Sequence, residues 1–383
     1  MTLPDAFRVA GIAAGLKRSG RLDLGLVLGD EPLTWAMVST ENLVKAPCVH
    51  RNRSRLASGE SVRALVVNSG NANCANGDGG AWDNEDFAGL TASALHLPRV
   101  QDVLTASTGV IGKRMPMDLV RAGVPKAVEA LQGDDAEPFA HAILTTDLVT
   151  KMASATLASG ARILGIAKGS GMIHPNMATM FTFVLTDAAV PQDALRALWR
   201  GVTDRTFNQI TVDGDTSTND MAIVLSSGTR RVDEGQFATA LEEVAADLAK
   251  QIARDGEGAT TLITVRVSGA RSDDDARRAA RAVAGSSLVK SAVHGRDPNW
   301  GRILSAVGST GVIADFGAVA IRLQGHVVFE GESRAFDEAT VSQAMRSEDV
   351  VIEVDLAAGE GTGHAWGCDL SAEYVRINAE YRT

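Results

Sequence analysis

One threonine stands where a turn-rich segment meets an apolar run, and that position could make it a nucleophile. The segment reads Lys168-Gly169-Ser170-Gly171-Met172-Ile173-His174-Pro175-Asn176-Met177-Ala178-Thr179-Met180. A threonine hydroxyl needs a base, and cleavage before Thr179 would supply one, because the new α-amino group has a reference pKa of about 7.7–8.0. The pattern therefore fits a threonine nucleophile that uses its own amine as base. Taken alone, a loop threonine before a strand is more typical of an ordinary turn.

A second candidate feature is the sequence Ser107-Thr108-Gly109, which follows the apolar stretch 103–106. Backbone N–H groups in a glycine-containing turn can converge on one oxygen, and a neighbouring hydroxyl can add a donor. Such an arrangement stabilises the oxyanion of an acyl transfer, although by themselves these residues are more typical of a plain turn. The asparagine-rich stretch 68–77 predicts a turn whose side chains bond the local backbone.

Other charged positions suggest binding chemistry. Glu257 lies between two glycines, so its carboxylate is constrained and could meet a cationic amine; a solvated turn is the alternative. Asp213, Asp215 and Asp220 could suggest a calcium loop, but the glycine position and the missing terminal glutamate do not match that pattern. We therefore expect no metal site.

Several of these segments together resemble one family over nearly the whole chain, from Gly11 to Thr383. The segment 168–180 looks like the self-cleavage segment of the ornithine acetyltransferase family, which is also called the glutamate N-acetyltransferase or bifunctional arginine-biosynthesis acetyltransferase family. Thr145-Thr146-Asp147, the segment 215–220 and Ser291-Ala292-Val293-His294-Gly295-Arg296-Asp297-Pro298-Asn299-Trp300-Gly301-Arg302 are similar to family segments as well. Leu148, Thr150 and Thr261 depart from the family pattern.

The resemblance implies that the chain cuts itself between Ala178 and Thr179, which gives an α chain, residues 1–178, and a β chain, residues 179–383. It implies that Thr179 is the nucleophile and that Thr108 and Gly109 form the oxyanion hole. The substrate contacts that it implies are Thr145, Lys168, Thr179, Glu257, Asn378 and Thr383.

The activity implied is the transfer of an acetyl group from N2-acetylornithine to glutamate by a ping-pong route, with ornithine and N-acetylglutamate as products. The family suggests an α2β2 assembly. No resident cofactor or metal is expected, and acetyl-CoA is left open as a further donor. The 291–302 motif should be structural, because Thr179 would supply its own base; we expect it to contain a strand end, a proline turn and a helix start.

Two other functions stay open at this point. A self-cleaving aminopeptidase or amidohydrolase of the same superfamily would pass the acyl group to water. A non-catalytic binding protein would never cleave itself.

Composition excludes several classes of protein. The chain has 383 residues, of which 45% are hydrophobic, and a formal net charge of −10. This charge argues against a nucleic-acid partner. The three cysteines, Cys48, Cys74 and Cys368, lack metal spacing and are typical of reduced thiols. The absence of a signal-peptide layout and of an 18-residue apolar run argues against export and membrane insertion, so we expect a cytoplasmic enzyme.

The helices and strands expected around these residues predict an α/β (α+β) fold. We expect a layered sandwich with helices packed on β-sheets, plus a smaller C-terminal α/β lobe. We expect a main lobe at 1–268 and a second lobe at 269–383, whose tail returns to the site. Residues 153–157 and 161–167 should form a hairpin that delivers Lys168. Gly123 and Pro125 should break or kink a helix at 118–131. The aromatic residues of the C-terminal tail should make the tail pack against the rest of the protein.

Overall fold

A computed structural model describes residues 1–174 and 180–380. The chain divides into two compact units. The first comprises Met1–Gly169, Asn176–Asn208 and Asp215–Leu248, and the second comprises Ser170–Pro175, Gln209–Gly214 and Ala249–Thr383. Each unit is described by itself.

The first unit is built on an eight-stranded sheet, in which the strand order is β4-β3-β2-β9-β7-β6-β5 and β1 also pairs with β2. Its strands are β1 (Phe7–Ile12), β2 (Leu24–Ser39), β3 (Val62–Asn71), β4 (Val103–Val110), β5 (Lys151–Thr156), β6 (Arg162–Lys168), β7 (Phe181–Ala189) and β9 (Met221–Arg231). The long strand β2 pairs with β1 and β3 through its first half and with β9 through its second half. It therefore belongs to both parts of the sheet.

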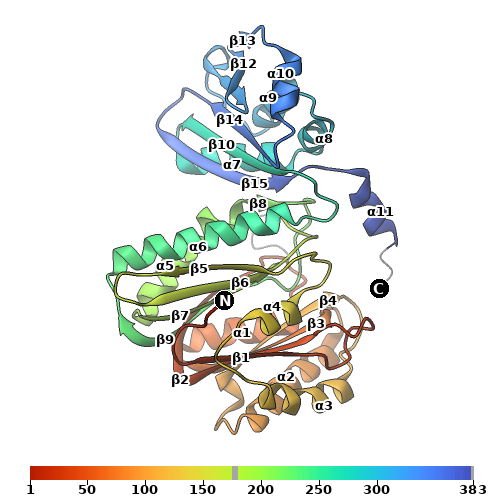
Figure 1. The fold of residues 1–383 in the computed structure, drawn as a ribbon, viewed down its shortest axis with the longest axis vertical. Helices are drawn as coiled ribbons and strands as arrows, with labels where there is room; N and C mark the ends of the chain where they lie inside the picture. The colour runs from red at the N-terminus through yellow and green to blue at the C-terminus, as the bar shows by residue number, and fades with distance from the viewer. Residues whose placement is uncertain (175–179, 381–383) are drawn as a thin grey trace. The chain divides into compact units, whose positions relative to one another are not determined.

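Helices cover the outer faces of this sheet, with α2 and α3 on one side and α5 and α6 on the other (Figure 1). The helices are α1 (Pro47–Ser58), α2 (Gly77–Ala94), α3 (Met117–Glu129), α4 (Glu137–Ile143), α5 (Gln192–Arg205) and α6 (Glu234–Arg254), the last of which continues into the second unit. Alternating side chains of the strands explain the layers. Leu24 and Leu26 of β2 pack towards α2 and α3, whereas Val27 joins a central core that also contains Phe183 of β7.

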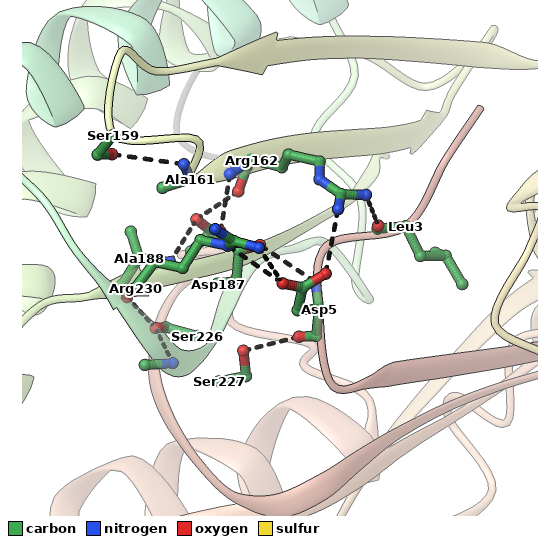
Figure 2. A network of polar contacts seen from close by, with 12 residues as sticks. Leu3, Asp5, Ser159, Ala161, Arg162, Asp187, Ala188, Ser226, Ser227 and Arg230 are labelled. Carbon is green, nitrogen blue, oxygen red and sulfur yellow. Dashed lines mark hydrogen bonds and ion pairs between the residues drawn. The ribbon is translucent and has the colours of Figure 1, made fainter.

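One end of β6, β7 and β9 is tied to the N-terminal segment by a polar network (Figure 2). The fully buried Asp187 carboxylate accepts hydrogen bonds from the backbone N–H groups of Arg162, at 2.7 Å, and Asp5, at 3.1 Å. The Asp5 carboxylate lies 3.1 Å from Arg162 and 2.6 Å from Arg230. Every carboxylate of this network therefore has hydrogen-bond partners.

The second unit has a seven-stranded sheet with the order β13-β12-β11-β14-β10-β15-β8. Its strands are β8 (Ile210–Thr211), β10 (Leu262–Ala270), β11 (Ala320–Leu323), β12 (His326–Glu330), β13 (Glu332–Ser333), β14 (Asp349–Asp355) and β15 (Gly361–Cys368). Its helices are α7 (Asp273–Gly285), α8 (Ser287–Gly295), α9 (Trp300–Gly308), α10 (Glu338–Ala344) and α11 (Ala372–Glu380). The predicted boundary after residue 268 falls inside β10, all of which lies in this unit because it pairs with β14 and β15.

The layered α/β class and the hairpin are confirmed, since β5 and β6 pair antiparallel up to Ala167, the residue before Lys168. Three local predictions were wrong. Helix α3 continues through Pro125. The chain before the 291–302 turn is helix α8, whose start is capped by the Ser286 side chain, and not a strand end. The tail helix α11 buries none of its residues, because its fixed points are polar contacts.

The three cysteines are buried and carry free thiols. No helix within the described ranges is long and apolar enough to cross a membrane.

Candidate active site

The buried end of β6 carries Lys168, whose ammonium group joins two other predicted site residues of the first unit. Its Nζ donates to Thr108 Oγ1 and to Thr145 Oγ1, each at 3.2 Å. Lys168 is 2% exposed, so its charge is held among these hydroxyl groups rather than in solvent. Lys168 and Thr108 come from strands β6 and β4, and Thr145 comes from the connection between α4 and β5, so separate parts of the first unit assemble the cluster.

Asp147 balances this charge. Its Oδ1 accepts from Lys151 Nζ at 2.7 Å and from the backbone N–H of Gly169 at 2.6 Å. Burial alone would raise the pKa of Asp147, but the ammonium groups of Lys151 and Lys168 outweigh it and hold that pKa at about 2. Asp147 also accepts from the Thr145 backbone N–H at 2.9 Å, so one ionised carboxylate fixes the backbone on both sides of the cluster.

Thr108 and Gly109 lie in strand β4 and not in the predicted turn, and the backbone at Gly109 suits only glycine. Gly109 has φ +128°, and a Cβ there would lie 2.5 Å from the carbonyl carbon of Gly70. The parallel pairing of β3 and β4 is irregular at this point, after Gly70 and Gly109 face each other. Bulges of this kind release a strand from regular pairing and are frequent beside active sites. The backbone at this irregularity of β3 and β4 can thus direct N–H groups away from the ladder.

Amide side chains fix the ends of these two strands. Asn219 Nδ2 donates to the backbone oxygens of Ala72, at 2.7 Å, and Ser107, at 2.6 Å. Asn71 Oδ1 accepts from the Asn73 N–H at 2.7 Å. The expected local stapling of the asparagine-rich stretch is therefore present, and it holds the chain beside Thr108.

Asp220, next to Asn219, is a buried carboxyl group. Burial raises the pKa of Asp220 well above its ordinary value, against the opposing effects of the Lys168 ammonium and of hydrogen bonds from Ser217 and the Met180 N–H. Its Oδ2 has no hydrogen-bond partner among the residues that the structure describes. The carboxyl group thus lies beside the first residue of the described chain after Thr179.

A second cluster lies within the second unit. Asn378 Nδ2 of α11 donates to Glu257 Oε2 at 2.9 Å, and the Glu257 N–H donates to Ser170 O at 2.9 Å. A Cβ at Gly171 would lie 2.5 Å from the Glu257 carboxyl carbon, so the glycine makes room for the carboxylate. Two residues predicted to bind substrate, Glu257 and Asn378, are therefore direct neighbours.

The 291–302 motif makes local contacts in the same unit. His294 Nδ1 lies 2.7 Å from Asp369 Oδ2, and Arg302 Nη1 donates to Leu288 O at 2.8 Å. Asp213, from the suspected calcium loop, accepts from the N–H groups of Met172 and Ile173. These groups hold turns together. Ala178, Thr179 and Thr383 lie outside the described residues, so their predicted roles stay predictions.

Comparison with known proteins shows which family the chain belongs to. A model of the ArgJ family matches residues 8–383. The chain belongs to the ArgJ family. It is 54% identical to the arginine biosynthesis bifunctional protein ArgJ of Deinococcus radiodurans, over all of this chain and 98% of the relative. It is also 54% identical to the protein of the same name from Thermus thermophilus, over all of this chain and 99% of the relative.

A solved structure of an ArgJ family member agrees with the fold. The crystal structure of the arginine biosynthesis bifunctional protein ArgJ from Bacillus halodurans matches with a TM-score of 0.52 and 45% identity, covering 53% of this chain and 100% of that chain. The predicted family is confirmed. As a member of the ArgJ family, the chain is an acyltransferase of arginine biosynthesis, and the hypothesis of a non-catalytic binding protein is set aside.

Sequence reasoning gave no role to three charged residues of the first unit that interact electrostatically with Lys168. Asp147 was seen only as part of a matching segment, although its spacing of four residues from Lys151 is a signal for an ion pair. Asp220 was considered only as a possible metal ligand, a role that was rejected, and its burial could not be predicted from a polar segment. Lys17, in the turn after β1, had no signal beyond its position after two glycines.

Proposed function

We propose that this enzyme transfers an acetyl group from N2-acetylornithine to glutamate through an acetyl-threonine intermediate. The observation that carries the proposal is the contact of Lys168 with Thr108 and Thr145 beside Gly109 of β4. A buried cation beside potential oxyanion donors suits a substrate carboxylate and an acyl-transfer reaction. The family match over the whole chain supports the same reaction.

Maturation would come first. Thr179 Oγ attacks the carbonyl carbon of Ala178, the Ala178–Thr179 C–N bond breaks, and an ester forms. Water then hydrolyses the ester, which leaves a carboxylate on Ala178 and a free amine on Thr179. The solved relative from Bacillus halodurans is matched completely by about half of this chain, as expected for a chain cut near its middle.

In the first half-reaction, Thr179 Oγ attacks the acetyl carbon of N2-acetylornithine while the Thr179 amine takes the hydroxyl proton. Thr108 and the Gly109 N–H stabilise the oxyanion, the bond from the acetyl carbon to the ornithine nitrogen breaks, and that nitrogen receives the proton. Lys168 and Thr145 hold the α-carboxylate end of the substrate. Glu257, Asn378 and Thr383 hold the cationic amine and the remainder of the amino acid.

In the second half-reaction, the glutamate amine attacks the acetyl ester and loses a proton to the Thr179 amine. The ester C–O bond breaks, N-acetylglutamate leaves, and Thr179 recovers its hydroxyl group. We also propose an α2β2 assembly in the cytoplasm and no resident cofactor. Acetyl-CoA would enter as an alternative acetyl donor, which release of its thiol in the presence of glutamate would test.

The intact mass of the purified protein under denaturing conditions tests the proposal first. Two masses that match residues 1–178 and 179–383 are expected, and the control Thr179→Ala should give a single 40.1 kDa chain. An uncut wild-type chain would remove the amine on which the mechanism depends.

Acetyl transfer is then measured with N2-acetylornithine and glutamate. We expect N-acetylglutamate and ornithine in equal amounts, with acetyl-Thr179 trapped in the β chain when glutamate is omitted. Rapid release of acetate without glutamate would instead indicate the hydrolase alternative.

A further inference from the structure

The turn between β1 and β2 holds a lysine over the end of β3. The fully buried Asp23 accepts from the backbone N–H groups of this turn, Ala14 at 2.6 Å, Gly15 at 3.1 Å and Lys17 at 2.9 Å. Three such bonds to one carboxylate fix the path of the backbone. The position of Lys17 is therefore set by the fold.

The Lys17 side chain passes close to Gly70 of β3, which pairs with Gly109 of β4. A Cβ at Gly70 would lie 3.1 Å from Lys17 Cγ, and a Cβ at Gly109 would lie 2.5 Å from the carbonyl carbon of Gly70. Two glycines on neighbouring strands thus allow the lysine stem, β3 and β4 to approach one another. Only the width of one strand separates Lys17 from the proposed oxyanion hole.

The ammonium group of Lys17 has no carboxylate within ion-pair distance in the described part of the chain. Its Nζ donates to Leu22 O at 2.7 Å, which uses one of its three N–H donors. Partial burial lowers the pKa of Lys17 to about 8, with Asp23 and Asp147 acting to raise it and Arg21 and Lys168 acting to lower it. A partly buried charge lowers stability unless it is paired. The carboxylate of a bound ligand would pair with the Lys17 ammonium group.

We propose that Lys17 binds the side-chain carboxylate of the acidic acceptor and so selects glutamate in the second half-reaction. The inference rests on the proposed function and deepens it. Both amino acids of that reaction have an α-carboxylate, which Lys168 suits, but only glutamate has a second carboxylate. The first unit offers a second ammonium group, Lys17, close enough to Lys168 for each to affect the other electrostatically. The donor, with a cationic side chain, gains nothing from it.

The test compares Lys17→Met with Lys17→Arg and with Arg18→Met, a control at the exposed neighbouring residue. Lys17→Met should raise the KM for glutamate about 10- to 100-fold, the effect expected for loss of a charged hydrogen bond. Formation of acetyl-Thr179 from N2-acetylornithine, followed by mass in a single turnover, should change less than about 3-fold by the same reasoning. Lys17→Arg should retain most of the affinity for glutamate.

A second readout separates binding from a structural role. Wild-type enzyme should prefer glutamate to glutamine as acceptor, and Lys17→Met should lose most of that preference. The wild-type KM for glutamate should rise above pH 8 as Lys17 loses its proton, whereas Lys17→Arg should show no such rise. If Lys17→Met fails to fold, Lys17→Gln takes its place, because its amide can still donate to Leu22 O.

Equal effects of Lys17→Met on both substrates, or unchanged discrimination between glutamate and glutamine, would overturn the inference. Failure of the proposed function has a different signature, because wild-type enzyme would then not transfer acetyl from N2-acetylornithine to glutamate at all.

Discussion

Strands β6, β7 and β9 carry charged groups at both ends, and the two ends are built differently. At one end, Arg162, Asp187 and Arg230 form the network of Figure 2, in which guanidinium groups and backbone N–H groups satisfy the carboxylates. At the other end, Lys168 terminates β6, and Asp220 directly precedes β9. There the cations are lysines, the partners of Lys168 include hydroxyl groups, and Asp220 Oδ2 has no partner in the described chain.

The difference indicates separate tasks for the two ends. Arginine binds carboxylates in a fixed, planar geometry, which suits a permanent structural contact, whereas lysine is a flexible point charge whose pKa shifts readily. A buried carboxyl group with an unused oxygen lowers stability. The arginine network therefore holds the sheet together, and the lysine cluster keeps polar groups available at a cost in stability.

The largest effect is expected when the charged residue at either end of β6 is replaced by methionine. Lys168→Met should lower kcat/KM about 10²- to 10³-fold, because it removes the cation beside Thr108. Arg162→Met, the matched control at the start of β6, should lower Tm and leave the kcat of the folded enzyme nearly unchanged. Steady-state kinetics and thermal unfolding are measured for both variants. Similar kcat values for the two would contradict the assignment of separate tasks to the two ends of the strands.

Gly109→Ala should affect activity nearly as much. Its Cβ would meet the backbone of Gly70 at 2.5 Å, so the backbone at this end of β4 must move, and we expect a loss in kcat of about 10²-fold. Gly160→Ala is the control, since Gly160 also has a positive φ, +82°, but its Cβ would meet only the end of the Arg230 side chain, at 3.4 Å. The control should lose about 1 kcal/mol of stability with little change in kcat, and equal kcat values for the two variants would argue against a role for the backbone at Gly109.

At the arginine end, Asp187→Ala should reduce stability rather than chemistry. The change leaves the N–H groups of Arg162 and Asp5 without their acceptor, which should lower the free energy of unfolding by about 1–3 kcal/mol. Urea unfolding measures this change, with kcat as the second readout. A variant that unfolds normally but has lost its activity would show that the two ends are not separate in function.

The smallest effect concerns pH at the lysine end. Because burial raises the pKa of Asp220 in the folded state, its contribution to stability is complete below the unfolded pKa of about 3.9 and is lost as the pH rises. Asp220→Asn does not titrate, so its Tm should exceed that of wild type at pH 8, and the difference should shrink towards pH 4. A lower Tm for the variant at pH 8 would show that Asp220 is a stabilising anion.

The sequence predicted the class of fold and the family, because long motifs and strongly periodic strands are local signals. It also predicted that β6 would deliver Lys168, and the contact of Lys168 with Thr108 agrees with a shared site. It could not predict that α3 continues through Pro125, or that no residue of α11 is fully buried, since both depend on tertiary packing. The burial of Asp220 and the approach of Lys17 to Gly70 likewise arise only when distant strands meet.

The strand order of the first sheet affects how the mature, cleaved enzyme unfolds and refolds. Strands β9 and β7, from the part of the chain after the proposed cut, lie between β2 on one side and β6 on the other, both from the part before it. Once Ala178 and Thr179 separate, the two polypeptides are interleaved, and neither can leave without breaking hydrogen-bonded ladders on both flanks. Refolding of the denatured mature protein then becomes a bimolecular reaction that slows on dilution, whereas the uncut Thr179→Ala chain refolds at a rate independent of its concentration. Cleavage would thus turn a reversible folding reaction into a practically irreversible one.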